Sequence, residues 1–147
     1  VPIKGLLPGL AVHMARCCHP IPGDPIVGLI TTGKGVTIHT RDCDNLVNYQ
    51  DQPERWLGVS WDIDDQEERF VTRLAVIITN EPGSLGTLTT LIGKNHGNVT
   101  NLKFTNRSHD FFELLVDVEV QDVSQMNNVI ASLRASRYVS HVERKKR

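Results

Sequence analysis

The chain has 147 residues, of which 39% are hydrophobic and 22% are charged, and its net charge at pH 7 is −1. This length and composition indicate a soluble globular protein with one ordinary domain or two small ones, and they exclude a disordered chain. The small net charge gives no overall electrostatic reason for tight binding to nucleic acid. No apolar run approaches the roughly 18 residues of a membrane span, and no signal peptide opens the chain. We therefore expect a cytoplasmic protein with no membrane partner.

The chain begins with Val1 rather than Met, so we expect a fragment of a longer protein. Its three cysteines, Cys17, Cys18 and Cys43, are odd in number, and two of them are adjacent. This pattern argues against a secreted disulfide framework. It favours a reducing compartment, in which the cysteines bind a metal or remain buried thiols.

The acidic segment at residues 62–68 is the most polar stretch of the chain and separates two differently patterned halves. We interpret it as a linker because it is short and too charged to bury. The predicted domains are therefore residues 1–64 and residues 65–147.

The N-terminal half predicts a small, loop-rich α+β domain. Residues 6–24 carry many prolines and glycines and are expected to be mostly loop. Residues 25–40 predict a β-hairpin, with a tight turn at residues 33–35.

The rest of this half predicts a short helix and a strand. Residues 44–49 predict one or two helical turns capped by Asp44 or Asn45. Residues 55–62 predict a strand with Trp56 in the core. The domain has few apolar residues and many loops. It therefore needs an additional stabilising link, or staple, such as a bound metal ion or a partner.

The C-terminal half predicts strands and helices in the order β-α-β-β-α-β, which is the ferredoxin-like arrangement of an antiparallel sheet with two helices on one face. The strands are expected at residues 69–79, 98–105, 108–120 and 138–144, the helices at 84–94 and 122–136, and a turn at 106–110. The apolar helix faces are Leu85, Leu88, Leu91 and Ile92 in the first helix and Met126, Val129, Ile130 and Leu133 in the second. Asp122 or Ser124 would cap the second helix.

Both halves resemble known families. The C-terminal half, with NEPGSLGTL at residues 80–88 and GNVTNL at residues 97–102, resembles the ACT domains, regulatory modules that bind amino acids. The stretch CCHPIPGDPIVGLITTGKGVTIHTRDCDNL at residues 17–46 resembles the cysteine-containing domain of long Rel/SpoT proteins. Those proteins are the synthetase/hydrolases of the alarmones guanosine tetra- and pentaphosphate. The resemblance implies an α+β chain in which a zinc-finger-like domain precedes a ferredoxin-like ACT domain.

The junction between the first strand and helix of the C-terminal half has the residues of an anion-binding turn. Pro82 ends the strand, and Gly83 permits a positive φ or a close approach of the backbone. Unpaired N–H groups and the dipole at the start of the helix favour an anion such as an amino-acid carboxylate. The carbonyl of the Asn80 side-chain amide would accept a hydrogen bond from the α-amino group of the ligand. The plainer interpretation is a turn with a helix cap and no ligand.

The resemblance implies that the amino acid lies between two ACT copies, with the start of the second strand contributed by the facing subunit. The apolar surroundings, which include Leu102, favour valine, isoleucine or leucine. We therefore expect a homodimer formed through the ACT domain. The predicted amino-acid-binding residues are Asn80, Glu81, Pro82, Gly83, Ser84, Leu85 and Leu88, with Asn98, Val99 and Thr100 from the facing copy.

Three cysteines and a histidine of the N-terminal half form the ligand set of a structural zinc site, which would supply the missing staple. His13 and His19 are alternative ligands, and the resemblance favours the set of three cysteines with His39. A cluster of buried free thiols, or a redox or RNA-contact role, would explain the same residues. The predicted metal ligands are Cys17, Cys18, His39 and Cys43.

Two catalytic interpretations fail. Residues 28–35 match most of a P-loop, but Gly35 stands where magnesium needs Ser or Thr, and a strand is predicted to follow. A cysteine–histidine nucleophile would need an orienting acid in a defined cleft, and the sequence indicates none. We therefore predict no catalytic residue in this chain.

The resemblance implies a non-catalytic regulatory region of a (p)ppGpp synthetase/hydrolase of the stringent response. An amino acid bound to the ACT domain would shift the balance between synthesis and hydrolysis in the upstream catalytic domains. One alternative is an interaction module for the ribosome and tRNA with no small-molecule ligand, for which Arg16, Lys34 and Arg41 are candidate RNA contacts. The other is the effector domain of a metabolic enzyme, against which the cysteine-containing half argues.

Overall fold

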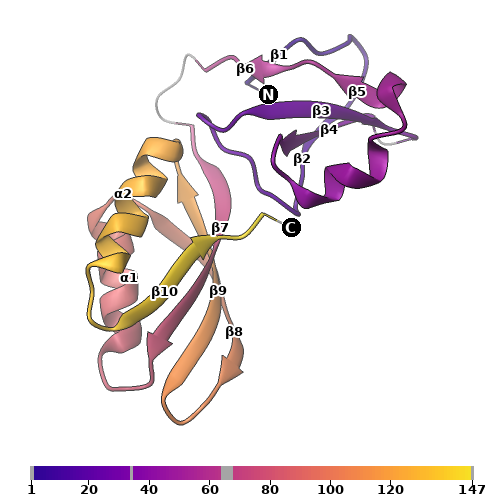
Figure 1. Ribbon diagram of the computed structural model, residues 1–147. Coiled ribbons are helices and arrows are strands. Elements are labelled where there is room, and N and C mark those ends of the chain that lie inside the picture. Colours follow the sequence, from indigo (N-terminus) through magenta and orange to yellow (C-terminus); the bar gives the residue numbers. More distant parts are fainter. Residues whose placement is uncertain (1, 34, 64–67, 147) are drawn as a thin grey trace. The chain divides into compact units, whose positions relative to one another are not determined.

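The structure, a computed structural model, describes residues 2–33, 35–63 and 68–146. It divides into two compact units, Val1–Glu68 with Lys146–Arg147 and Arg69–Lys145 (Figure 1). Lys34 of the predicted hairpin turn and residues 64–67 of the predicted linker lie outside the described residues. The domain boundary predicted between residues 64 and 65 lies there too and stays a prediction. No helix formed by the described residues is long and apolar enough to cross a membrane.

The N-terminal unit is built around the predicted β-hairpin. Its strands β3 and β4 pair antiparallel over their whole length, and β2 joins β4 in parallel to give the sheet order β2-β4-β3-β5. A two-stranded sheet of β1 and β6 completes the unit. The elements are β1 (Ile3–Lys4), β2 (Val12–Met14), β3 (Ile26–Thr31), β4 (Gly35–Thr40), η1 (Asp44–Tyr49), η2 (Pro53–Arg55), β5 (Trp56–Leu57) and β6 (Ser60–Trp61).

The strand β2 lies in a segment that was predicted to be loop. It can approach β4 because Gly35 has φ 82°, and a Cβ there would lie 2.2 Å from the Ala11 carbonyl oxygen. That oxygen accepts the Val36 N–H at 2.8 Å. A glycine is therefore required where the two chain segments meet.

The strand predicted at residues 55–62 is divided between two sheets. Its first part, β5, pairs with β3, and its second part, β6, pairs with β1. Trp56 is half-buried against the core and donates its indole N–H to the Tyr49 carbonyl at 2.8 Å. Trp61 donates to the Asp24 carbonyl at 3.0 Å. Each half-buried indole thus donates to a different backbone carbonyl.

The helix predicted at residues 44–49 is a 3-10 helix rather than an α-helix. Neither Asp44 nor Asn45 caps it, because the N-cap position is Cys43 and no side chain accepts a capping hydrogen bond. The predicted cap is therefore wrong.

The second unit has the predicted ferredoxin-like β-α-β-β-α-β order. All its strand pairs are antiparallel, in the order β10-β7-β9-β8, and both helices cover one face of the sheet (Figure 1). The elements are β7 (Phe70–Thr79), α1 (Ser84–Lys94), β8 (Asn98–Arg107), β9 (Phe111–Val120), α2 (Val123–Arg134) and β10 (Val139–Arg144).

The core of this unit lies between the sheet and the helices. Alternate residues of β7 and β9 are buried, as the period of two along a strand requires. The predicted apolar face of α2 is confirmed, whereas Leu85 and Leu91 on α1 are only half-buried. The buried apolar side chains of this core are Leu74, Val76, Ile78, Leu88, Ile92, Leu114, Val116, Val118, Val120, Met126, Val129, Ile130, Leu133 and Val142.

The start of α2 is closed by a reciprocal cap. Asp122 accepts the Gln125 N–H at 2.8 Å, and the Gln125 side chain accepts the Gln121 N–H at 2.7 Å. The Gln125 amide also donates to the Asn95 carbonyl at 3.0 Å, just beyond the end of α1. The cap therefore also connects the two helices. Of the two predicted caps, Asp122 is correct and Ser124 is not.

We expect Asp122→Ala to lower the free energy of unfolding of this unit by about 1 kcal/mol, because one N–H of the first turn loses its acceptor. Ser124→Ala is the matched control, since Ser124 is exposed and is not the cap, and it should change stability by less than about 0.5 kcal/mol. Urea denaturation followed by circular dichroism measures both. Equal losses in the two variants would contradict the assigned cap.

Candidate functional site

The turn from β7 into α1 has a left-handed residue at its centre. Gly83 is the N-cap of α1 and has φ 86°, a conformation that costs other residues about 1–2 kcal/mol. The Glu81 carbonyl accepts the Ser84 N–H at 3.2 Å, and the Gly83 carbonyl accepts the Thr87 N–H at 2.9 Å. The first bond closes the turn and the second begins the helix.

Two amides at the start of α1 remain available. Within the described part of the chain, the N–H groups of Leu85 and Gly86 have no hydrogen-bond acceptor. First-turn amides together with the helix dipole attract anions. The turn therefore has the donors that a carboxylate needs.

The predicted residues around this turn differ in accessibility. Glu81 and Leu85 are half-buried and Pro82 is exposed, so all three can meet a ligand. Ser84 and Leu88 are buried, and Leu88 belongs to the core. Of the aliphatic residues predicted on α1, Leu85 is thus the one at the surface of the turn.

Asn80 fastens the turn to the neighbouring hairpin. Its backbone N–H donates to the Asp110 carbonyl at 2.9 Å, and its side-chain Nδ2 donates to the Ser108 carbonyl at 2.9 Å. Both acceptors lie in the turn between β8 and β9. This turn consists of residues 108–110, because β8 ends at Arg107 and β9 begins at Phe111, and it is shorter than predicted. The Asn80 side chain has a structural role, and its Oδ1 is the atom able to accept a hydrogen bond from an α-amino group.

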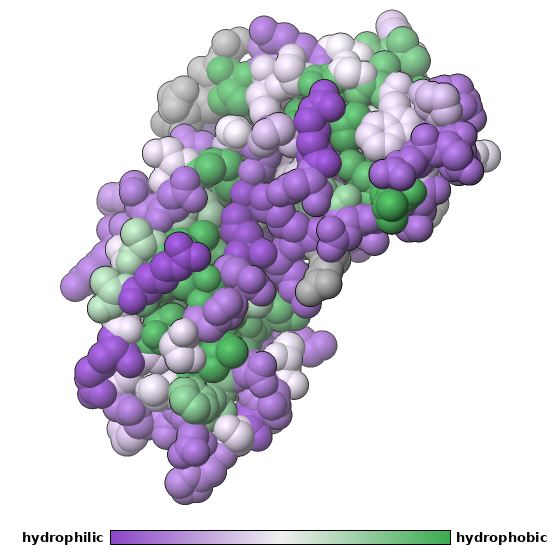
Figure 2. Space-filling model, in the orientation of Figure 1, coloured by the Kyte–Doolittle hydropathy of each residue, from purple (hydrophilic) through white to green (hydrophobic). Residues whose placement is uncertain are grey.

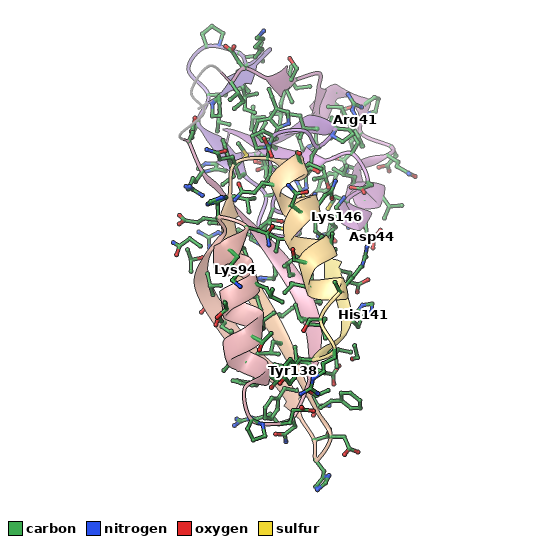
Figure 3. All side chains as sticks on the ribbon, turned by 90° about the vertical axis from the view of Figure 1, so that its left-hand side faces the viewer. Arg41, Asp44, Lys94, Tyr138, His141 and Lys146 are labelled. Atoms are coloured by element: carbon green, nitrogen blue, oxygen red, sulfur yellow. The ribbon has the colours of Figure 1, made fainter. Side chains whose placement is uncertain are left out.

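Arg137 and Tyr138, between α2 and β10, contact the same turn and were not found from the sequence. Arg137 pairs with Glu81 at 3.0 Å and donates to the Tyr138 hydroxyl at 2.8 Å. That hydroxyl lies 3.9 Å from where a Cβ on Gly83 would be. Tyr138 lies at the end of the unit where α1 begins (Figure 3). No local sequence pattern predicts a contact between residues so far apart in sequence.

The second part of the predicted amino-acid site lies elsewhere in the same chain. Asn98 is opposite Glu119, which is opposite Val71 at the start of β7, whereas the turn follows Thr79 at its end. The strand between Val71 and Thr79 spans about 26 Å at roughly 3.3 Å per residue. One chain therefore does not bring Asn98, Val99 and Thr100 to the turn.

The predicted metal ligands are brought together in the N-terminal unit. Cys17 and Cys18 lie in the turn after β2, His39 lies on β4, and Cys43 precedes η1. Cys18 and Cys43 pack in one core cluster with Val27 of β3 and Leu46 of η1. Their ligand atoms all lie within 4.8 Å of one another. Within the part of the chain that the structure describes, His13 and His19 do not belong to this group.

The spacing of these atoms fits zinc. The Cys17 sulfur lies 3.5 Å from the Cys43 sulfur and 3.6 Å from the His39 Nδ1, and the Cys18 sulfur lies 3.8 Å from the same nitrogen. Tetrahedral zinc, with Zn–S near 2.3 Å and Zn–N near 2.0–2.1 Å, separates two sulfurs by about 3.8 Å and a sulfur and a nitrogen by about 3.6 Å. The donor set and the spacing thus suit a structural zinc ion.

Burial favours the uncharged forms of three members of this cluster, Cys18, Cys43 and His39, when no cation is bound. It raises the pKa of the Cys18 thiol to about 12, against the opposing effect of a hydrogen bond from the Thr40 N–H. Burial likewise raises the pKa of Cys43 and lowers that of His39. A bound dication would supply the charge that stabilises thiolates, and the neutral imidazole is already the form that binds metal.

Each half of the chain matches a known domain family. Residues 1–62 match the RelA/SpoT RIS domain, and residues 66–144 match the ACT domain. The GTP pyrophosphokinase rsh of Brucella ovis is 42% identical over 145 residues, which cover 98% of this chain and 19% of that protein. The bifunctional (p)ppGpp synthase/hydrolase SpoT of Escherichia coli is 33% identical over 144 residues, with 98% of this chain and 20% of that protein covered.

A crystal structure of the ACT domain from the GTP pyrophosphokinase of Chlorobium tepidum is 19% identical, with a TM-score of 0.46, and covers 52% of this chain and 99% of that chain. The ferredoxin-like unit, matched over its length by the ACT model, is an ACT domain. The chain is homologous to the C-terminal region of Rel/SpoT proteins and carries a RIS domain followed by an ACT domain. It spans about a fifth of the length of these curated relatives.

We predict that the reduced protein holds about one zinc ion per chain and that Cys43→Ser loses most of it, because one of four ligands is removed. His13→Ala is the matched control, since His13 is exposed on β2 and outside the cluster, and its zinc content should equal that of the wild type. Elemental analysis of the purified proteins measures the content.

Near-zero zinc in the wild type and in Cys43→Ser would establish a cluster of buried free thiols instead. Zinc lost equally from His13→Ala would contradict the choice of ligands.

Proposed function

We propose that this chain is the regulatory region of a bifunctional (p)ppGpp synthetase/hydrolase and that its ACT domain binds a branched-chain amino acid: valine, isoleucine or leucine. The observation that carries the proposal is the turn at Gly83, where the amides of Leu85 and Gly86 are available to a carboxylate. The similarity to the GTP pyrophosphokinase rsh of Brucella ovis and to SpoT of Escherichia coli supports the enzyme class. The half-buried side chain of Leu85 favours an aliphatic ligand over a charged one.

The mechanism is a population shift. The amino acid binds one arrangement of the regulatory region better than another and so changes the balance of synthesis and hydrolysis in the catalytic domains. A differential affinity of about tenfold corresponds to ~1.4 kcal/mol, which is enough to move a balanced equilibrium substantially. In this role the RIS–ACT region itself performs no chemistry.

A homodimer would complete the site. β8 is an edge strand, and its last residue, Arg107, is opposite Phe112, beside the end of β7 from which the turn leaves. A second β8 added antiparallel would run in the opposite direction, so its first residues, Asn98, Val99 and Thr100, would come to the end of the sheet that carries the turn. Hydrophobic side chains also reach the surface of the ACT domain on the face drawn in Figure 2.

We further propose that Cys17, Cys18, His39 and Cys43 bind zinc as the staple of the RIS domain. Their spacing supports this assignment, and the unit is small enough to need it. Zinc here is structural, because four protein ligands leave no open position for a reactant.

A second candidate function is contact with the ribosome or tRNA. Its supporting observation is a hollow of about 940 Å³ in the RIS domain, lined in part by Arg16, His13 and Thr37. Arg16 and Arg41 are both exposed, as RNA contacts must be. Local cations could bind phosphate although the net charge of the chain is near zero.

We expect Gly83→Val to weaken amino-acid binding by about tenfold or more, because a side chain at a left-handed N-cap displaces the backbone that presents the amides. Gly93→Val is the matched control: Gly93 lies on α1, is exposed, and has nothing within 4 Å of an added Cβ. Titration of the isotope-labelled chain by NMR with each common amino acid reports both affinity and fold. Unchanged affinity in a folded Gly83→Val protein would contradict the assigned turn.

If the site is shared between copies, two inactive variants should complement each other. Gly83→Val lacks the turn and Asn98→Ala lacks the facing residue, so each alone should bind poorly. Mixing them should restore part of the binding, because a mixed dimer contains one intact site. No recovery in a mixture shown by mass spectrometry to contain mixed dimers would contradict the shared site.

If no amino acid shifts any resonance of the wild type, the amino-acid function is wrong. Salt-sensitive RNA binding that Arg16→Ala and Arg41→Ala weaken would then establish the second candidate.

A further inference from the structure

The cysteine cluster contains a pair of sulfurs placed to react with each other. The sulfurs of Cys17 and Cys43 are 3.5 Å apart, and a disulfide bond requires about 2.05 Å, so they must approach by roughly 1.5 Å. Neither residue is in a strand, because Cys17 lies in the turn after β2 and Cys43 lies between β4 and η1. Small side-chain rotations can therefore close the bond without breaking the sheet.

The third cysteine is held differently. The Cys18 sulfur accepts the Thr40 N–H at 3.4 Å and lies 3.8 Å from the His39 ring, and its side chain is completely buried. Cys17 is only half-buried, so it is the sulfur that an oxidant reaches first. A bond between the adjacent Cys17 and Cys18 would have to close across one peptide unit, far from the usual disulfide geometry. The contacts therefore select Cys43 as the partner of Cys17.

We propose that Cys17 and Cys43 form a reversible intramolecular disulfide when the protein meets a hydroperoxide, and that Cys18 stays reduced. The Cys17 sulfur attacks the hydroperoxide: an S–O bond forms, the O–O bond breaks, and the thiol proton leaves on the alcohol or water released. The Cys43 sulfur then attacks the Cys17 sulfur: the S–S bond forms, the S–O bond breaks, and the hydroxyl leaves as water with the Cys43 proton. The peroxide is reduced by two electrons, and the two thiols are oxidised.

This disulfide and the zinc ion exclude each other. Oxidation withdraws two of the four ligands and leaves Cys18 and His39, which are too few to complete a structural site. The coupling to zinc depends on the proposed metal site, whereas the disulfide itself does not. A peroxide signal would thus release the staple of the RIS domain, and a dithiol reductant would restore it.

The test treats the reduced whole chain with hydrogen peroxide, alkylates the remaining thiols, and locates the modified cysteines by peptide mass spectrometry. We expect the number of alkylated cysteines to fall from the three present to a single one, Cys18, and to recover with dithiothreitol. In zinc-loaded protein, a chromogenic chelator should report zinc release in step with the loss of thiols. The disulfide should form without an increase in oligomer size.

Two variants make the pairing specific. Cys18→Ser should still lose both remaining thiols, whereas Cys17→Ser should keep both of its thiols. NMR spectra of each variant establish that it is folded, and if Cys17→Ser is not, the wild-type peptide map decides the pairing by itself.

A disulfide that contains Cys18, a disulfide between chains, or over-oxidation of Cys17 without loss of the Cys43 thiol would each overturn the proposal. Equal disulfide formation in a folded Cys17→Ser protein would do the same. Failure of zinc binding alone would remove the proposed metal site but leave the disulfide to be judged by the peptide map.

Discussion

The arrangement of the ACT domain depends on the central strand β7. It pairs with β9 without a register shift from Phe70 opposite Val120 to Thr79 opposite Phe111, and β10 pairs along its other side. A strand held on both sides has a fixed end, so the turn that follows it has a fixed position. The backbone of Thr79 adds a bond to Tyr138 on the connection between α2 and β10. The candidate effector site thus follows directly after a strand that is paired on both sides.

This placement would allow a short turn to bind the proposed effector with precision. Asn80 fastens the turn to the β8–β9 hairpin, Arg137 pairs with Glu81, and Gly83 supplies the one conformation that begins α1 at this place. The exposed ion pair itself contributes little to stability, so its effect is mainly on geometry. Because the amides are held before a ligand arrives, binding does not have to order them. An effector that bridges two copies would then act on the relation between subunits and not on the fold of either.

The RIS domain solves a different problem, which is stability with few apolar residues. One of its core clusters consists of Ala15, Cys18, Val27, Cys43 and Leu46, and two of these residues, Cys18 and Cys43, are also predicted metal ligands. With zinc bound, the same atoms would therefore serve both packing and cross-linking. A domain stapled in this way is sensitive to metal supply and to oxidants, whereas the ACT domain relies on a conventional core. The two proposed inputs to the regulatory region are consequently of different chemical kinds.

Much of this protein is encoded in local patterns. The order β-α-β-β-α-β, the bounds of α1 and the buried face of α2 follow from hydrophobic periodicity and from the turn chemistry around Gly83, which act over a few residues. The four residues predicted as metal ligands do lie close together, because the hairpin of β3 and β4 returns the chain, and their binding of zinc stays a prediction. These features need no knowledge of distant contacts.

Other features were decided only by the tertiary structure. The division of residues 55–62 between two sheets and the strand β2 depend on partners far along the chain, which no periodicity reveals. The same holds for Arg137 and Tyr138 beside Gly83 and for the choice of Cys43 over Cys18 as the neighbour of the Cys17 sulfur. The sequence by itself determined the order of elements in the ACT domain and which side chains are candidates for binding. The tertiary structure decided which of those side chains touch, because contact depends on the packing of segments that are remote in sequence.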